Sequence, residues 1–303
     1  MKTPVRELTG VFCCPGTCKD EAMRIAVTGS SGKLGTVVVR ELSAMGYEVI
    51  GMDRVGQRGP SFVQVDFTDY GQVIDAFGAV GDRHDGIDAV VHLAAIPAPG
   101  IQSDVATFHN NMTASFNVLW AATRLGIRTV VTASSETVQG LPFDVPPPYI
   151  PADEAYPPRP ESTYSLVKTL EERMAVELVR WFPDLSLTAL RFSNVMWPED
   201  YAEFPSFDDD AMLRKWNLWS YIDARDGAQA IAKALEKKLP GFNHFLIANA
   251  DTVMTRPNAE LIAEVFPDVP LKGEIGENTT LFSIDKAREI LGYEPQHSWR
   301  DHV

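Results

Sequence analysis

Short apolar runs alternate with longer segments of helical periodicity along the first two thirds of the chain. The apolar runs, rich in Val, Ile and Ala, cover residues 24–28, 48–52, 62–65, 89–93, 129–133 and 187–191. Helical patterns lie between them, notably at residues 34–45, 104–125 and 162–181. Nearly continuous apolar strands that alternate with helices are typical of a parallel sheet with helices on both faces. The pattern therefore predicts an α/β protein with a doubly wound parallel sheet.

The alternation of strands and helices ends after Asn194. A polar stretch at residues 197–217 includes two prolines and three consecutive aspartates. Helical patterns follow at residues 226–238, 258–265 and 284–291, with an apolar run near residues 244–248. We interpret residues 196–303 as a small C-terminal cap, partly interleaved with a main domain of residues 23–195. Eight prolines between residues 142 and 160 predict an extended loop at the border of a cleft.

Charge and hydropathy exclude two classes of partner. The 303-residue chain has a net charge of −14, which disfavours binding along a nucleic-acid backbone or to an anionic membrane surface. No apolar run reaches the roughly 18 residues that span a bilayer. We therefore expect a small-molecule substrate, with no nucleic-acid partner and no membrane.

All three cysteines, Cys13, Cys14 and Cys18, lie in the first 22 residues. No fourth ligand completes a zinc site, so we expect no metal. We interpret residues 1–22 as a disordered leader, with metal or redox chemistry as the alternative, and Met23 as a possible true start. The absence of cysteine from the rest of the chain fits a cytoplasmic enzyme without disulfides.

A glycine-rich loop follows the first predicted strand. Its spacing is G-x-x-G-x-x-G, at Gly29, Gly32 and Gly35. Glycines here allow a tight turn and a close approach of backbone N–H groups to a pyrophosphate at a helix N-terminus. Asp53 ends the second strand, where a carboxylate accepts hydrogen bonds from the adenosine ribose and repels a 2′-phosphate. This favours NAD over NADP, although Arg54 could pair with a phosphate.

A second acidic residue, Asp66, follows the third strand. It could reach the adenine amino group or simply cap the end of its strand, and both alternatives stay open. His92, on an apolar strand, is interpreted as a buried packing residue rather than a ligand. The residues that we expect to bind the cofactor are Gly29, Ser31, Gly32, Lys33, Leu34, Gly35, Asp53, Arg54, Asp66, Phe67, Leu93, Ala94, Ala95, Tyr164 and Lys168.

Tyr164 and Lys168 are four residues apart, so they lie on one face of a predicted helix. The lysine ammonium is expected to lower the pKa of the phenol from about 10 towards neutrality. A phenolate at neutral pH is a general base for an alcohol. The pair Ser134-Ser135 would by itself indicate a strand-end cap. Together with Tyr164 and Lys168, it predicts a catalytic hydroxyl.

These motifs occur in the order found in the extended short-chain dehydrogenase/reductases, the NAD-dependent epimerase/dehydratase group. The chain also resembles that group at His92-Leu-Ala-Ala95, at Asn111 and Asn117, and at Arg191-Phe-Ser-Asn194. The resemblance runs from about Met23 to the C-terminus. It implies a Rossmann-type NAD-binding domain at residues 23–195, a small substrate-binding region at residues 196–303, and a homodimer formed by the helices at 104–125 and 162–181.

The resemblance also implies roles for individual residues. Ser135 would hydrogen-bond the substrate oxygen, and Tyr164 would be the acid/base. Lys168 would bind the nicotinamide ribose and hold the phenolate. Asn111 would have a structural and proton-relay role, and Asn194 is a further candidate for substrate contact.

The chain departs from the family pattern after the catalytic serine. Gln139 replaces the usual tyrosine, and Glu136-Thr137 replaces the Asp-Glu pair of the dehydratases. Without the second carboxylate, the base for water elimination is missing, so dehydration is disfavoured. Only 24 residues separate Asn194 from Trp219. Relatives that act on nucleotide-linked sugars are typically longer there, so the short segment suggests a smaller, free substrate.

This short segment is similar to that of free-uronate dehydrogenases, because Arg214 and Lys215 precede Leu218-Trp219-Ser220. The planar fork of Arg214 could clamp a substrate carboxylate. Alternatively it could pair with the aspartates at 208–210. Arg225 is interpreted as structural.

The resulting hypothesis is an NAD-dependent oxidoreductase that acts on a secondary alcohol of a small sugar or sugar acid. The first alternative is a nucleotide-sugar 4-epimerase with the same Ser-Tyr-Lys site. The second is a non-catalytic NAD-sensing regulator, which is disfavoured because such proteins commonly lack the tyrosine or the lysine.

Overall fold

The computed structural model describes residues 22–57, 59–78 and 86–302. The predicted leader, with its three cysteines, lies outside this range except for Ala22. Within the described part of the chain, no helix is both long and apolar enough to cross a membrane.

The main domain is built on one seven-stranded parallel sheet with the order β3-β2-β1-β4-β5-β6-β9. The strands are β1 (Arg24–Thr28), β2 (Glu48–Asp53), β3 (Phe62–Gln64), β4 (Ala89–His92), β5 (Thr129–Ser135), β6 (Ser186–Phe192) and β9 (Gly241–Ile247). The order reverses between β1 and β4, which opens a crevice at the carboxyl ends of the strands. The predicted doubly wound parallel sheet is confirmed.

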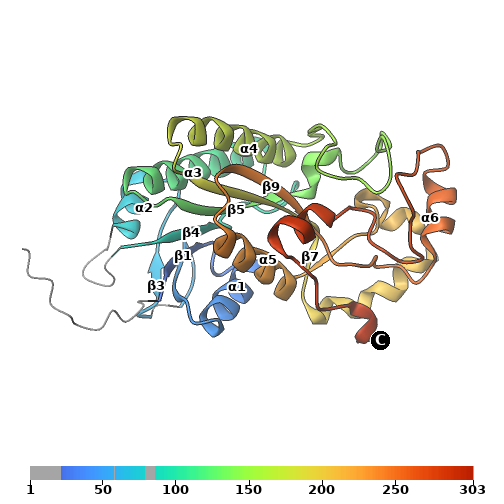
Figure 1. Cartoon of the computed structure of the whole chain (residues 1–303), viewed down its shortest axis with the longest axis horizontal. Helices are drawn as coiled ribbons and strands as arrows, with labels where there is room; N and C mark the ends of the chain where they lie inside the picture. The colour runs from blue at the N-terminus through green and yellow to red at the C-terminus, as the bar shows by residue number, and fades with distance from the viewer. Residues whose placement is uncertain (1–21, 58, 79–85, 303) are drawn as a thin grey trace, which may run out of the picture.

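Helices cover both faces of this sheet (Figure 1). On one face lie α2 (Tyr70–Phe77), α3 (Asp104–Arg124) and α4 (Thr163–Trp181), and on the other lie α1 (Lys33–Ala44) and α5 (Ala224–Lys237). Ser103 caps α3, and a capping box between Ser162 and Ser165 starts α4. The long predicted helices therefore begin where short polar side chains satisfy their first free N–H groups.

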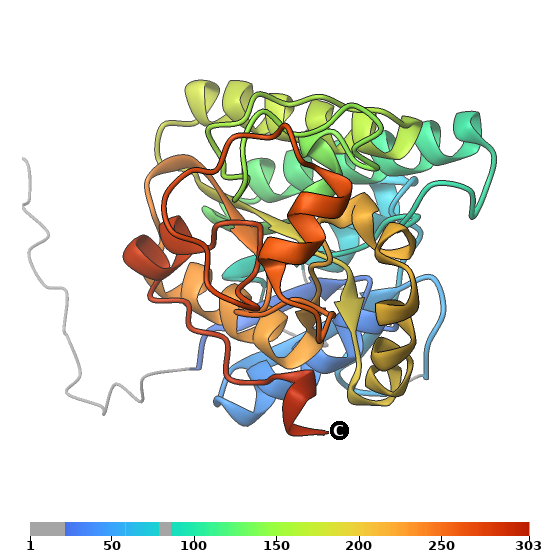
Figure 2. The ribbon, with the colours of Figure 1, turned by 90° about the vertical axis from the view of Figure 1, so that its right-hand side faces the viewer.

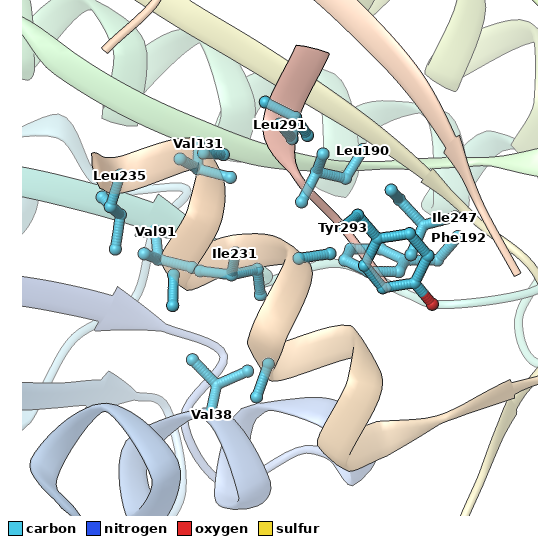
Figure 3. Packing of buried hydrophobic residues seen from close by; sticks show 14 of the residues in the cluster. Val38, Val91, Val131, Leu190, Phe192, Ile231, Leu235, Ile247, Leu291 and Tyr293 are labelled. Atoms are coloured by element: carbon cyan, nitrogen blue, oxygen red, sulfur yellow. The ribbon is translucent and has the colours of Figure 1, made fainter. Parts of the chain in front are cut away.

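Two apolar cores hold the helices to the sheet. The first packs side chains of α1 and α5 against the strands, and Figure 3 shows Val38, Ile231 and Leu235 beside Val91 of β4. Tyr293 closes one end of this core, and its hydroxyl donates to the carbonyl of Ala248 over 2.9 Å. The second core lies beneath α2, α3 and α4.

The C-terminal region and the loop at residues 141–156 together form a third core. The C-terminal elements gather at one end of the sheet, the end that faces the viewer in Figure 2. Buried aromatic side chains such as Phe204, Trp219, Tyr221 and Trp299 pack together there. Its elements are β7 (Val195–Met196), β8 (Ile222–Asp223), α6 (Asn258–Val265), the 3₁₀ helices η3 (Pro198–Asp209), η4 (Ala211–Leu213), η5 (Lys215–Asn217) and η7 (Trp299–Asp301), and the π-helical turn η6 (Ala287–Leu291). Another 3₁₀ helix, η2 (Glu136–Gln139), follows β5.

Several sequence-based boundaries differ from the structure. The stretch at 197–217, predicted only as polar chain, forms consecutive 3₁₀ helices that bury Tyr201 and Phe204. The helix predicted at 284–291 is helical from Asp285 to Leu291 and takes a π-helical form over η6 (Ala287–Leu291), and β9 begins at Gly241, earlier than its apolar run indicated. Two elements that follow Asn194 in the sequence belong to the main sheet rather than to the C-terminal region. Strand β9 pairs with β6, and α5 packs against one face of the sheet.

Candidate active site

The glycine-rich loop connects β1 to the N-terminus of α1, and close contacts between backbone atoms set its shape. Gly29 has a φ of +70°, and a Cβ there would lie 2.7 Å from the backbone nitrogen of Ala94. A Cβ on Gly35 would lie 2.0 Å from the carbonyl oxygen of Gly29. No side chain caps α1. The first N–H groups of the helix therefore face the crevice, an arrangement that fits a pyrophosphate.

The end of β2 supplies an acidic group beside this loop. Asp53 Oδ2 accepts a hydrogen bond from the backbone N–H of Ser31 over 3.0 Å. The carboxylate of Asp66 instead holds Thr68, through both its N–H and its hydroxyl, and these bonds lower the pKa of Asp66. Both carboxylates line the cleft. Asp66 thus acts as a cap and also borders the cleft, and its contact with the adenine stays a prediction.

A single cavity of about 930 Å³ runs from the glycine-rich loop to the end of β6, within the size range of ligand pockets. All fifteen predicted cofactor residues line it, together with Ser135 and Asn194. The other lining residues include Asn110, Glu136, Thr137, Leu141, Pro142, Ser193 and Trp216. Residues predicted from separate motifs are therefore brought to one cleft.

Ser135, Tyr164 and Lys168 come together at the carboxyl end of β5. Tyr164 is buried, and Ser135 forms a hydrogen bond with its phenol. The Lys168 ammonium lies 5.8 Å from the centroid of the Tyr164 ring. Thr137 donates to Ser135 Oγ through its hydroxyl (3.0 Å) and its backbone N–H (3.2 Å). With two donors on its oxygen, the serine proton is directed away from Thr137.

The net effect of the surroundings on Tyr164 is opposite to the sequence-based expectation. Burial raises the pKa of Tyr164, the charge of Glu171 raises it further, and Glu136 adds to this effect once its own carboxyl is ionised. Lys168 and the hydrogen bond from Ser135 lower the pKa but do not outweigh burial. Lys168 alone therefore does not bring the phenol to neutrality, because a buried phenolate loses its hydration.

Lys168 has partners of its own. Its ammonium donates to the carbonyl of Ala133 over 3.0 Å and to Glu171 Oε2 over 2.8 Å. Burial lowers the pKa of Lys168, but the neighbouring Glu171 carboxylate outweighs burial and the net direction is upward. The ammonium is thus held charged beside Tyr164.

Asn111 is placed differently from the other predicted site residues. It is buried in α3, where its side chain accepts from the N–H of Ile96 (2.8 Å) and donates to the Ile96 carbonyl (3.0 Å). Asn111 does not line the cleft, whereas its neighbour Asn110 does. The geometry matches the structural half of its predicted role, and the relay half stays a prediction.

Glu136 follows Ser135 directly in the sequence and lines the part of the cleft away from the glycine-rich loop. It is buried, and Asn217 Nδ2 donates to its Oε1 over 3.2 Å. Burial raises the pKa of Glu136 to about 8, against the opposing effects of Ser193, Asn217 and Arg214. The carboxyl is therefore protonated at neutral pH. The sequence motifs include Glu136 only as the first half of the dehydratase pair, and its place next to Ser135 is the signal that could have indicated it.

The structure supports neither alternative for Arg214. Its guanidinium is buried between the rings of Phe207 and Trp216, with its carbon 5.1 and 5.0 Å from the ring centroids. Its Nη2 donates to the carbonyl of Ser220 over 3.0 Å. Trp216 lines the cleft, but Arg214 does not. Among the three aspartates, Asp208 accepts from Thr255 rather than from Arg214.

The remaining predicted polar residues have structural contacts. His92 is buried and contacts Thr28 Oγ1 (2.8 Å) and Ser115 Oγ (3.1 Å). Arg225 binds Asp223 through two nitrogens, at 2.9 and 2.8 Å. Gln139, in place of the family's tyrosine, donates to the carbonyl of Asp153. Among the residues that the structure describes, no cluster of His, Cys, Asp or Glu has the arrangement of a metal site.

Comparison with known proteins agrees with this geometry. The model of the NAD dependent epimerase/dehydratase family matches residues 25–248. A UDP-glucose 4-epimerase from Lacticaseibacillus casei is 26% identical over 93% of this chain and 94% of its own length. An L-arabinose 1-dehydrogenase (NAD(P)(+)) from Haloferax volcanii is 28% identical over 72% of this chain and 84% of its own length.

Solved structures give the same result. A crystal structure of a UDP-galactose 4-epimerase is 30% identical, covers 91% of this chain and 94% of its own, and has a TM-score of 0.64. A mutated uronate dehydrogenase, 23% identical with coverages of 93% and 85% and a TM-score of 0.65, supports the fold alone. The chain therefore belongs to the NAD dependent epimerase/dehydratase family and is an enzyme of the extended short-chain dehydrogenase/reductase type.

Proposed function

We propose that this enzyme is an NAD-dependent dehydrogenase that oxidises a secondary alcohol of a small, free sugar. The observation that carries the proposal is the charge of the cleft. Its cationic lining residues, among those described, are Lys33, Arg54 and Lys168. Lys33 and Arg54 lie at the cofactor end, and Lys168 is paired with Glu171.

A sugar nucleotide carries a pyrophosphate that needs cationic or N–H partners. The substrate end offers instead a protonated Glu136, the hydroxyls of Thr137 and Ser193, and the ring of Trp216. These groups suit the hydroxyls and the apolar face of a neutral sugar. The sugar-acid half of the sequence-based prediction has less support, because Arg214 is buried, interacts with Glu136 and is not among the residues that line the cleft.

The mechanism follows from the three catalytic side chains. Tyr164 would remove the proton of the substrate hydroxyl, and Ser135 would hydrogen-bond the same oxygen as negative charge develops on it. Lys168 lowers the pKa of Tyr164 relative to burial alone. A bound nicotinamide would supply the hydride acceptor, and its positive ring would favour the phenolate further. Asp53 favours NAD over NADP, since its carboxylate lies where a 2′-phosphate would be repelled.

The test is a panel of aldoses, uronates and sugar nucleotides with NAD and with NADP, read as reduced-cofactor absorbance. We expect NADH to accumulate with a free neutral sugar. Tyr164→Phe should keep its affinity for NAD and lose turnover by about 10²- to 10⁴-fold. Unchanged turnover in this variant would refute the mechanism.

The 4-epimerase remains the second candidate, because a UDP-glucose 4-epimerase matches over nearly the whole chain. An epimerase returns its hydride, so it would convert a sugar nucleotide without accumulating NADH. Conversion of UDP-glucose with a flat absorbance trace would favour this candidate. The regulator alternative predicts that the chain binds NAD but neither accumulates NADH nor converts UDP-glucose.

The homodimer and the cytoplasmic location are further proposals. Helices α3 and α4 lie side by side and expose Val105, Phe116 and Leu166. These apolar side chains support a dimer through the two helices, as the family resemblance implies.

A further inference from the structure

A buried chain of hydrogen bonds leads from the start of the glycine-rich loop to the catalytic lysine. Thr28 Oγ1 lies 2.8 Å from His92 Nδ1, and His92 Nε2 lies 3.1 Å from Ser115 Oγ. Ser115 Oγ donates to Glu171 Oε1 over 2.6 Å, and Lys168 Nζ donates to Glu171 Oε2 over 2.8 Å. The chain therefore joins β1, β4, α3 and α4.

The direction of every bond in this chain follows from its ends. Thr28 Oγ1 accepts from the N–H groups of Leu93 and Ala94, both at 3.2 Å, so its own proton goes to His92 Nδ1. His92 then donates through Nε2 to Ser115, which donates to Glu171. Burial and the charge of Lys168 lower the pKa of His92 to about 3, so the ring is neutral, as this pattern requires.

We propose that Glu171 is a positioning residue for catalysis, which holds the Lys168 ammonium beside Tyr164 and is itself held by Ser115 and His92. This inference rests on the proposed function only for its kinetic readout. The Lys168 and Glu171 side chains are 5% and 12% exposed, so the pair is shielded from water and from salt. None of the sequence motifs includes Glu171, which lies three residues after Lys168 on α4.

The charges around Tyr164 determine the direction in which Glu171 shifts the pKa of the phenol. Tyr164 is faced by Lys168 and Glu171 from α4 and by Glu136 from η2. Lys168 is faced by Glu171 and Glu172 from its own helix, and His92 of β4 is neutral. The Glu171 charge therefore acts against the phenolate while it fixes the lysine. The enzyme gains a fixed ammonium, and its base is protonated over a wider pH range.

The experiment replaces the charge and keeps the shape. In Glu171→Gln, the amide oxygen can still accept from Lys168 or Ser115, but the negative charge is gone. We expect the acidic limb of the pH profile of kcat/KM to move to lower pH by about 0.5 to 1 unit, because Tyr164 ionises more easily. The Tyr164 ζ-carbon NMR resonance, assigned with Tyr164→Phe, should shift its titration midpoint in the same direction in the free protein.

Two controls separate charge from structure. Glu177→Gln removes an exposed carboxylate from the same helix, where it pairs with Arg173 and Arg180, and should leave both readouts in place. Ser115→Ala keeps the charges of Lys168 and Glu171 and removes the bond that orients Glu171. It should lower kcat several-fold without the acid-ward shift.

The outcomes are distinguishable. A limb and an NMR midpoint that both stay in place would overturn the role of Glu171, because neither its charge nor its hold on Lys168 would then act on Tyr164. If no substrate of the panel yields NADH, the proposed function fails, but the tyrosine titration still decides on Glu171.

Discussion

The ion pair between Glu172 and Arg191 offers a stability prediction with a defined magnitude. Arg191 on β6 donates to both carboxylate oxygens of Glu172 on α4, at 2.9 and 2.7 Å, and Ser134 donates to the same carboxylate over 2.6 Å. The side chains are only 2% and 9% exposed. Burial raises the pKa of Glu172, but the bonds from Arg191 outweigh burial and the net direction is downward.

Glu172→Gln leaves the Arg191 charge buried and turns an amide N–H towards it. Breaking a buried pair in this way costs about 3–5 kcal/mol of unfolding free energy. For a chain of 303 residues, the loss corresponds to a decrease in Tm of roughly 5–8 °C. Urea and thermal denaturation followed by circular dichroism would measure both. Glu177→Gln on the same helix, whose ion pairs are exposed, should cost less than about 1 kcal/mol.

The direction in which the stability loss of Glu172→Gln changes with pH also follows from the structure. A carboxyl whose folded pKa is depressed contributes stability above its unfolded pKa and loses it as the pH falls. The difference in unfolding free energy between wild type and Glu172→Gln should therefore decrease as the pH falls below 4.5, the ordinary pKa of glutamate. A loss under 1 kcal/mol at pH 7, or a gap that widens with acid, would refute the reasoning. The double variant Glu172→Met/Arg191→Met should recover most of the loss, because no charge is left unpaired.

Three further predictions address the loop, the substrate end and the assembly. Gly35→Ala should weaken NAD binding by roughly 100-fold or more in calorimetry, because its Cβ would meet the Gly29 carbonyl at 2.0 Å, whereas Gly59→Ala, with nothing within 4 Å, should bind normally. The Tm of Glu136→Gln should rise relative to that of wild type between pH 5 and pH 8. A carboxyl with a folded pKa of about 8 destabilises the wild-type protein as the pH rises through this window. A difference in Tm that does not change with pH would argue against a protonated Glu136. Phe116→Glu with Leu166→Glu should convert a dimer to a monomer in light scattering, and a wild-type monomer would exclude the dimer outright.

Local sequence determined the sheet and the cofactor loop. The alternation of apolar runs and helical patterns depends on periodicities of two and 3.6 residues, which need no knowledge of distant contacts. The glycine spacing between β1 and α1 is equally local, and so is the four-residue separation of Tyr164 and Lys168. The position of Asp53 followed because every strand of a parallel sheet ends at the same edge.

The placements that the sequence did not foresee depend on long-range packing. Arg214 was proposed from its residue type, but the folding of η3 to η5 buries it between two aromatic rings. Asn111 makes the structural contacts expected of it, at Ile96, while the packing of α3 places its neighbour Asn110, which was not predicted, at the cleft. A side chain's exposure depends on elements that meet only in three dimensions, so no spacing rule reveals it.

The sequence by itself determined which residues could perform the chemistry, and only the tertiary structure decided their charges. The Tyr164 and Lys168 pair is set by one helical turn. The pKa of Tyr164 instead depends on its burial and on carboxylates such as Glu136, which acts on the phenol through its charge from another element. The role proposed for Glu171 could be inferred only from the folded structure, in which α4 packs against α3 and Ser115 donates to Glu171. Electrostatics at a buried site is a sum over all neighbours in a medium of low polarity, so it is fixed only when the chain is folded.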